Sequence, residues 1–459
     1  MAYIYRSNSS ASGTTATISA WVKSVRTDHD AGVFQFKSGS NTISFYTNPV
    51  MKFRVYTSGG YSTGDLVNNN RKFRDFGGWW HVVATIDTTN ATSGERLRLY
   101  INGVRQTDFT TETYPSQNQS YSQLVSGNFE LGKYSATDRT TYLAHVHYCD
   151  GYAYNADSFG STDATTGQWK INTAPNVQYG SNGVFLKFAS AGALGTDSSG
   201  NNNTMSISGT ALQTQDNPSN NFCILNPLDR ATNNSTDNLN GLSNGNTTFD
   251  TTSANNLVIK ARGSIGVTSG KYYWEGKYNS GTAWAMGFCL QKLFEDNTAQ
   301  YWDSSTVMAV AANGGSGTLY FNGRVGDSFN TGVSLSGGDI FGFALDIDNK
   351  GFYVHRNGTY ITANSAVGNP TSGSSRTGSI LGELTTGGYQ NYIPDNEFIY
   401  PFCADISSGA PADMDMNFGN GYFGTTAISS EGTNASNIGK FEYDVPTGYT
   451  ALSTKGLNE

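Results

Sequence analysis

Two segments of this chain, 79–106 and 338–360, each combine two strands of alternating polarity with an Asn-Gly turn. The turns are Asn102-Gly103 and Asn357-Gly358. Alternation directs one face of a strand towards a core and the other towards solvent. An Asn-Gly pair between such strands is the strongest short-range signal of a β-hairpin. Because the segments lie far apart in the sequence, they predict two separate β-sandwich domains.

The rest of the chain favours the same class. Its 459 residues exceed the length of one ordinary domain. Only 37% of residues are hydrophobic but 13% are aromatic, and 54 are glycine. Helix signals and heptads are nearly absent. We therefore predict an all-β protein of two antiparallel β-sandwiches with cores rich in rings.

Period-two patterns also predict which side chains face each core and which face solvent. The inward residues expected for the first sandwich are Ala16, Ile18, Ala20, Val22, Met51, Phe53, Val55, Leu97, Leu99 and Ile101. Those expected for the second are Phe341, Phe343, Leu345 and Ile347.

Changes in this pattern divide the chain. Residues 1–160 form the first predicted sandwich, and 161–240 form an extended connector that large apolar residues such as Trp169, Phe185 and Phe222 hold on a neighbouring domain. The polar stretch from Thr232 is the predicted boundary. Residues 241–425 form the second sandwich, and 426–459 form a tail that completes it.

Charge and cysteine content limit the partners. The net charge of -8 argues against nucleic acid and anionic membranes. No apolar run is long enough for a membrane helix, and the N-terminal residues lack a signal-peptide pattern.

Four cysteines lie far apart, so we expect free buried thiols, as in cytoplasmic assembly. They are Cys149, Cys223, Cys289 and Cys403.

Two patterns could hold metals. His145 and His147 alternate on one strand, with Cys149 at the next position on the same face, so a zinc site is one interpretation. A row of residues that hydrogen bond to one another is the interpretation we prefer. The loops at Asp28–Asp30, Asp138 and Asp197 offer oxygens for calcium, with solvated acids as the alternative. We predict no metal site and no cofactor, with calcium as the remaining alternative.

No pattern predicts catalysis. A jelly-roll glucanase needs two carboxylates about 5 to 5.5 Å apart, which acids at alternate positions of one strand provide, and the chain has no ExDxxE pattern. Asp346 and Asp348 have the alternate spacing, but the following Asn349-Lys350-Gly351 predicts a tight turn. His81 fits a packed strand residue. Nucleophile, phosphate-loop and zinc-protease motifs are absent, so we predict a non-enzymatic protein.

Aromatic residues in polar loops are the candidate ligand-binding residues, because sugars and proteins dock on flat rings. Tyr301 and Trp302 lie in FEDNTAQYWDSS, and Tyr114 and Tyr121 lie in a second loop. The alternative is that these rings pack against the sandwiches.

Three resemblances add to these expectations. WWHVVATID, RLRLYINGVRQ and FELGKY resemble the laminin-G or concanavalin A-like lectin jelly roll. SGKYYWEGKY and GDIFGFALDIDNKGFYVHRNGTY are similar to a SPRY-like sandwich, in which Asp346, Asp348 and Gly351 would be strand and turn residues. The ordered run from Tyr142 to Asp229 resembles a phage tail-fibre or virion structural protein family.

These resemblances imply a tail fibre or appendage subunit that recognises a host surface glycan or protein by loop contacts. Its expected partners are other virion proteins, and its expected location is the virion, assembled in the bacterial cytoplasm. A homo-oligomer is expected, often a trimer in such appendages. The alternatives are a capsid or tail decoration protein without a host ligand and, as the weaker one, a polysaccharide depolymerase.

Overall fold

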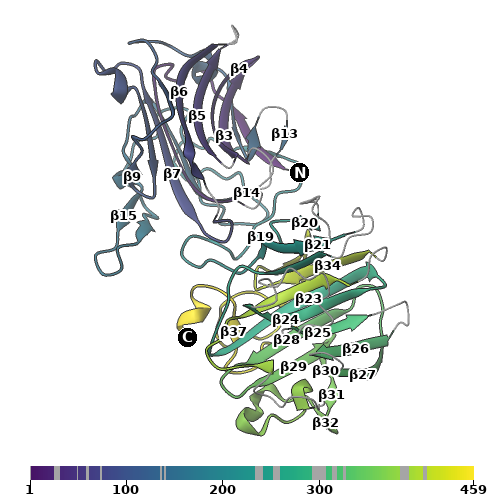
Figure 1. Cartoon of the computed structure of the whole chain (residues 1–459). Helices are drawn as coiled ribbons and strands as arrows, with labels where there is room; N and C mark the ends of the chain where they lie inside the picture. Colours follow the sequence, from purple (N-terminus) through teal and green to yellow (C-terminus); the bar gives the residue numbers. More distant parts are fainter. Residues whose placement is uncertain are drawn as a thin grey trace. The chain divides into compact units, whose positions relative to one another are not determined.

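A computed structural model gives the fold of this protein (Figure 1). The described residues are 2–24, 31–48, 50–57, 61–72, 75–134, 137–138, 141–232, 241–251, 259–291, 307–312, 318–323, 327–382, 392–406 and 411–459. The chain divides into two compact units. Unit 1 comprises Met1–Gln213 with Asn217–Ser219, and unit 2 comprises Thr214–Asp216 with Asn220–Glu459.

Unit 1 contains two main antiparallel sheets. The eight-stranded sheet has the order β10 (Thr111–Thr113), β6 (Tyr61–Lys72), β5 (Val50–Thr57), β4 (Asn41–Asn48), β3 (Ala31–Ser38), β11 (Asn128–Leu131), β1 (Tyr3–Ser7) and β18 (Ser206–Ser208). The six-stranded sheet has the order β17 (Val184–Leu186), β14 (Thr141–Asp150), β2 (Thr15–Ser24), β7 (Trp80–Asp87), β8 (Leu97–Ile101) and β9 (Val104–Arg105). Smaller elements are the ribbons β12 (Lys133–Tyr134) with β13 (Thr137–Asp138) and β15 (Gly160–Thr162) with β16 (Trp169–Ile171), and the helices α1 (Ser122–Val125), η1 (Ser93–Glu95) and η2 (Ala156–Ser158).

The predicted inward residues of unit 1 all lie in one buried core cluster, so the face assignment is confirmed. The turn between β8 and β9 has positive φ at both Asn102 (47°) and Gly103 (79°), as a two-residue hairpin requires.

The outer face of the six-stranded sheet differs from expectation. We expected its polar residues to face solvent, yet Thr17, Ser19 and Lys23 of β2 are all fully buried. A second apolar cluster covers this face, which contains Val83 of β7 and Phe159 and has Trp169 packed against it. The strand is therefore buried on both sides, because chain from beyond residue 150 returns over it.

The first sandwich also extends beyond the predicted boundary at residue 160. Strand β17 pairs with β14, and β18 pairs with β1, so residues from the predicted connector complete both sheets. The two units divide at residues 213–220, inside that predicted connector.

Unit 2 is a second two-sheet sandwich. Its seven-stranded sheet has the order β19 (Leu225–Thr232), β22 (Ile259–Gly263), β33 (Ile399–Asp405), β24 (Trp284–Leu290), β25 (Val307–Ala312), β26 (Thr318–Gly323) and β27 (Asp327–Ser334). Its other sheet has the order β20 (Leu242–Ser243), β21 (Thr248–Asp250), β34 (Ala412–Asn417), β23 (Lys271–Gly281), β28 (Ile340–Asp346), β29 (Gly351–Arg356) and β30 (Thr359–Tyr360), with β37 (Thr450–Ala451) beside β23. Smaller elements are β31 (Thr362–Ala363) with β32 (Ala366–Val367), β35 (Tyr422–Phe423) with β36 (Thr426–Ala427), and the helices η5 (Pro370–Ser375), η6 (Ile380–Gly382) and η7 (Gly456–Asn458).

The second hairpin of the sequence forms β28, β29 and β30, with positive φ at Asn357 (49°) and Gly358 (81°). The four predicted inward residues from Phe341 to Ile347 belong to the main core of unit 2. Both findings confirm what the alternation predicted.

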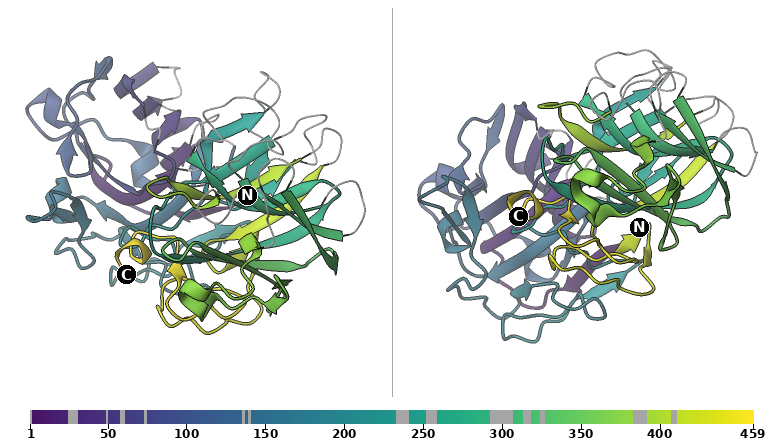
Figure 2. Two further views of the ribbon diagram at one scale, coloured as in Figure 1. Left: turned by 60° about the horizontal axis from the view of Figure 1, so that its bottom comes forward. Right: turned by 90° about the horizontal axis from the view of Figure 1, so that it is seen from below.

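The C-terminal segment packs on unit 2. Strand β37 pairs in parallel with β23, through Tyr272 and Thr450. Phe441 and Tyr449 join a buried cluster with Tyr273 of β23. Figures 1 and 2 show this segment in yellow beside the strands of unit 2. Among the described residues, no helix is both long and apolar enough to cross a membrane.

Candidate functional site

The outer face of the eight-stranded sheet carries a continuous row of polar side chains. Residues paired across neighbouring strands share a face of the sheet. The strand registers place one residue from each strand in this line, which we name the transverse row: Thr113, Asp65, Arg54, Ser44, Gln35, Glu130, Tyr5 and Ser206.

Ion pairs and hydrogen bonds order the row. Arg54 Nε donates to Asp65 Oδ1 at 3.0 Å, and the Gln35 side-chain amide donates to the Glu130 carboxylate. Lys133 Nζ lies 4.0 Å from Glu130 Oε1. Both carboxylates are almost buried, so each is held by a neighbour with a fixed geometry, as buried charge requires.

Further tyrosine rings lie on the same face, beside the row and next to its member Tyr5. Tyr46 and Tyr134 pack with ring centroids 3.8 Å apart, and Tyr3 and Tyr5 with centroids 5.3 Å apart. The Lys133 ammonium lies 3.7 Å from the centroid of Tyr3. Tyr56, at the other side, is 38% exposed. Tyr46 is only 2% exposed, so Tyr56 and the partly exposed Tyr3 and Tyr5 are the rings on which a sugar could stack.

The charge of this face is opposite to that of the chain. Its described basic side chains are Lys37, Lys52, Arg54 and Lys133, and its described acidic ones are Asp65 and Glu130. Four positive and two negative charges leave an excess of positive charge, while the chain as a whole carries -8. An acidic ligand would therefore be attracted to this face more than to the rest of the surface.

The two acids of the row are too far apart for glycosidase chemistry. Asp65 on β6 and Glu130 on β11 are separated by β5, β4 and β3. Four steps of about 4.8 Å place them ~19 Å apart. Paired catalytic carboxylates lie within about 5 to 9.5 Å. These two acids therefore do not form the carboxylate pair of a glycosidase.

None of the predicted ligand-binding residues belongs to the transverse row. Tyr301 and Trp302 fall outside the described residues. Tyr121 is 1% exposed and packs in the core, with its hydroxyl 3.2 Å from that of Thr63. This position corrects the expectation of an accessible ring. Tyr114 is half-buried against the same core, and its hydroxyl donates to Glu112. Burial and this hydrogen bond raise the pKa of Tyr114 to about 12.

His81 is a packed residue. Its ring lies between Trp21 and Trp169, with centroids 5.0 and 6.0 Å away. Trp169 Nε1 donates to His81 Nδ1, so Nε2 carries the proton and donates to Ser19 Oγ at 2.8 Å. A general base would have to accept the proton from that hydroxyl. Burial lowers the pKa of His81 to about 3.

A β-bulge interrupts the alternation expected for the other two histidines. The register with β2 shifts between Ala144 and His147, and His145 has a φ of 45°. His147 stacks on Phe185 and its Nδ1 lies 2.9 Å from the Tyr179 hydroxyl. Burial lowers the pKa of His147 well below its usual value. Cys149 lies in the apolar cluster on the outer face of the sheet.

The structure describes only some of the residues considered for calcium. Asp28–Asp30 and the side chain of Asp138 lie outside the described residues. Asp197 accepts hydrogen bonds from the backbone N–H groups of Phe185, Ser199 and Asn203. Both its oxygens therefore face donors. Within the described ranges, no group of three or more His, Cys, Asp or Glu could hold a metal ion.

Sequence reasoning missed the transverse row. The available signal was the inward prediction for Met51, Phe53 and Val55, because the alternating Lys52, Arg54 and Tyr56 of β5 must then point outward. Which residues of the other strands lie beside them depends on strand order and register, and these cannot be read from one strand.

Comparisons with known proteins give a family match and similar solved structures. A family model described as the Concanavalin A-like lectin/glucanases superfamily, Laminin_G_3, matches residues 2–140. The crystal structure of the SPRY domain of human HERC1 is similar at 18% identity and a TM-score of 0.26, covering 42% of this chain and 96% of that chain. A heptameric SAP-like pentraxin from Limulus polyphemus is similar at 12% identity and a TM-score of 0.26, covering 34% of this chain and 72% of that chain. A search of curated proteins finds no match. The all-β class and the concanavalin A-like fold predicted for the first sandwich are thus confirmed.

Proposed function

We propose that this protein is a non-enzymatic polysaccharide-binding protein that uses the transverse row of unit 1 and its flanking tyrosines as the binding face. The observation that carries the proposal is that the exposed Tyr56 ring and an excess of basic side chains lie on one sheet face, around a buried polar network that holds this face rigid. Such a face offers stacking, hydrogen bonding and attraction to acidic sugars.

The biological setting proposed for this binding is a phage appendage that recognises a host surface glycan. The support is the resemblance of the run from Tyr142 to Asp229 to phage virion proteins. Many copies on one particle would give avidity, so a single face need not bind tightly. Immunogold labelling of intact particles, together with binding of the purified chain to host cells, tests this setting; labelled particles without cell binding would favour a decoration protein.

The test of the binding face uses two tyrosines of nearly equal exposure. Tyr56 on the face is 38% exposed, and Tyr152 elsewhere in unit 1 is 39% exposed. Tyr56→Ala combined with Tyr5→Ala should weaken polysaccharide binding about tenfold, which corresponds to about 1.4 kcal/mol. Tyr152→Ala is the matched control and should bind like wild type. Biolayer interferometry on immobilised acidic and neutral polysaccharides gives the affinities.

Two further readouts separate the alternatives. Binding to an acidic polysaccharide should weaken as ionic strength rises, because salt screens the attraction to the basic side chains. Lys52→Gln should reduce this salt dependence. Equal binding by wild type and the Tyr5/Tyr56 variant would refute the proposed face, and release of reducing sugars would point to a depolymerase.

A further inference from the structure

Unit 2 contains a pocket of about 570 Å³ that the polysaccharide face of unit 1 does not explain. It is formed by the residues that lead into β23, the turn after β28 and the C-terminal segment. The residues that line it include Lys271, Tyr272, Asp348, Thr450, Gly456 and Glu459. Its volume lies within the range of about 300–1,000 Å³ typical of small-molecule sites.

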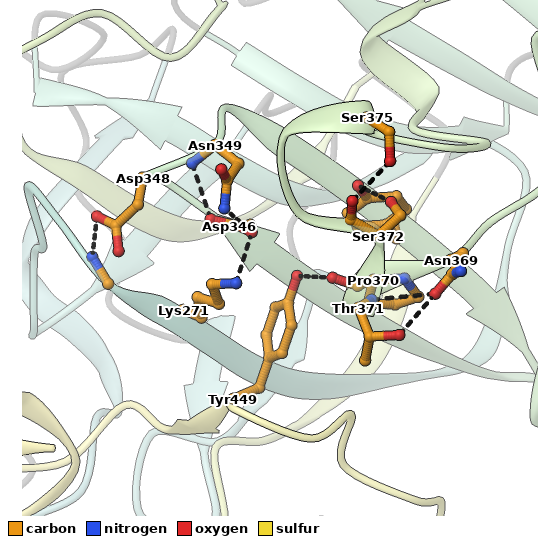
Figure 3. A network of polar contacts seen from close by, with 12 residues as sticks. Lys271, Asp346, Asp348, Asn349, Asn369, Pro370, Thr371, Ser372, Ser375 and Tyr449 are labelled. Carbon is orange, nitrogen blue, oxygen red and sulfur yellow. Dashed lines mark hydrogen bonds and ion pairs between the residues drawn. The ribbon is translucent and has the colours of Figure 1, made fainter.

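Several contacts hold the walls of this pocket in place (Figure 3). Lys271 Nζ contacts Asp346 Oδ2 at 3.1 Å, and Asp348 Oδ1 accepts from the backbone N–H of Gly270 at 2.8 Å. The Tyr449 hydroxyl donates to the carbonyl of Pro370 at 3.0 Å, which ties the C-terminal segment to η5. The walls therefore come from three separate parts of the chain that are fixed to one another.

One buried hydroxyl group in the pocket, that of Thr450, lacks a protein partner among the described residues. Thr450 is 6% exposed, and its Oγ1 has no hydrogen-bond partner among the described residues. A buried hydroxyl without a partner costs about 1–3 kcal/mol, so its position calls for an explanation. Gly456 leaves the space beside it, since a Cβ there would lie 3.0 Å from this oxygen.

Two more groups are available in the same pocket. Within the described part of the chain, the hydroxyl of Tyr272 forms no hydrogen bond, and Oδ1 is the only oxygen of Asp348 that accepts one. A hydroxyl both donates and accepts, and a carboxylate accepts. Together with Thr450, these groups match the alternating donors and acceptors of a ligand that carries several hydroxyl groups.

The charges of the pocket narrow the ligand class. Lys271 is paired with Asp346, which is almost fully buried, so its charge is largely compensated. Asp348 and Glu459 then leave the lining acidic, which disfavours an anionic ligand. A metal ion does not fit, because no set of three or more His, Cys, Asp or Glu in the described ranges could hold one.

We propose that this pocket is a second carbohydrate site, which binds a neutral sugar unit through Thr450, Tyr272 and Asp348. We assign a ligand that carries hydroxyl groups because the Thr450 hydroxyl has no protein partner among the described residues. We assign a neutral ligand because the lining of the pocket is acidic. The site is independent of the basic face in unit 1, whose charge favours acidic sugars.

The experiment measures sugar binding by the full chain with isothermal titration calorimetry and saturation-transfer NMR. The probes are glucose, galactose, mannose and their disaccharides, with glucuronic acid as the acidic probe. A double variant, Thr450→Val with Tyr272→Phe, removes only the two unpartnered hydroxyls. It should weaken binding of the preferred neutral sugar at least tenfold while thermal stability stays equal or rises. Thr362→Val, at an exposed position on β31, is the matched control and should leave both unchanged.

Each other outcome overturns the inference. If the double variant binds neutral sugars as wild type does, the sugar binds outside this pocket. If no neutral probe binds to the wild-type protein, the pocket is not a sugar site. Preference for glucuronic acid would contradict the charge argument. The Tyr5/Tyr56 variant of unit 1 should keep neutral-sugar binding, so a failure of the unit 1 proposal is distinguishable from a failure of this one.

Discussion

The indole of Trp169 donates a hydrogen bond to Nδ1 of His81 at 3.0 Å, and the two rings lie nearly parallel, 20° apart. Trp169 belongs to β16, in the segment that returns over the six-stranded sheet, and His81 belongs to β7 of that sheet. The contact therefore joins the covering segment to the sandwich, and it defines the neutral tautomer of His81.

Trp169→Phe should destabilise unit 1 by about 1–3 kcal/mol, because it leaves the buried Nδ1 of His81 without a donor. Chemical denaturation monitored by circular dichroism measures the change. Trp21→Phe is the matched control: Trp21 stacks on the same histidine, but its Nε1 has no partner among the described residues. A loss for Trp169→Phe no greater than for Trp21→Phe would show that packing alone holds the indole.

Acid should destabilise unit 1 through His81. Burial lowers the pKa of His81 from 6.5 to about 3 in the folded protein. The unfolded chain therefore binds this proton more readily, so the contribution to stability is complete above pH 6.5 and is lost as pH falls through about 3. The loss is on the order of 3–5 kcal/mol. His81→Gln should flatten the dependence of the denaturation midpoint on pH in this range; an unchanged slope would assign it to other groups.

Glu275 should act in the opposite direction in unit 2. Its buried carboxylate accepts from the backbone N–H groups of Glu442 and Tyr443, from the Tyr273 hydroxyl and from the Asn417 amide. Burial raises the pKa of Glu275 to about 7 against the lowering effect of these hydrogen bonds. The stability it contributes is therefore complete below pH 4.5 and is lost as pH rises through about 7.

Hydrogen exchange at the amides of residues 442 and 443 checks this prediction. Their intrinsic exchange also accelerates with pH, so protection factors must be compared, and these should fall between pH 5 and 9. Glu275→Gln should lower protection at one of the two amides, because the two N–H groups donate to different oxygens of Glu275 and the new NH2 group replaces only one of these acceptors. Amides of the β24 core serve as the internal reference. Equal protection in the variant would contradict the role of Glu275 as the anchor of the C-terminal segment.

The four cysteines should be unreactive in the native protein. All four are free and buried, and burial raises the pKa of the Cys289 and Cys403 thiols. Because the thiolate is the reactive form, an aromatic disulfide reagent should titrate none of them rapidly under native conditions and all four in denaturant. Rapid reaction of any native thiol would show that a cysteine is accessible.

Much of the sandwich architecture follows from local sequence. Alternation identified the inward side chains of β2, β5, β8 and β28, and the Asn-Gly pairs identified two turns, because both signals depend on residues close together in the chain. The candidate sites do not follow in this way. Arg54 and Asp65 are neighbours through strand pairing, and Gln35 and Glu130 come together from strands far apart in sequence.

The sequence by itself determined the all-β class, the two sandwiches and the hairpin turns, because period-two patterning and turn chemistry are local properties. The lectin-like fold of the first domain was predicted from its resemblance to a known family. The tertiary structure decided that β2 is buried on both faces, that Tyr121 is a core residue, and that the transverse row and the pocket around Thr450 exist. The reason is that burial of an outward face, strand order and the meeting of a C-terminal segment with β23 depend on contacts between distant parts of the chain.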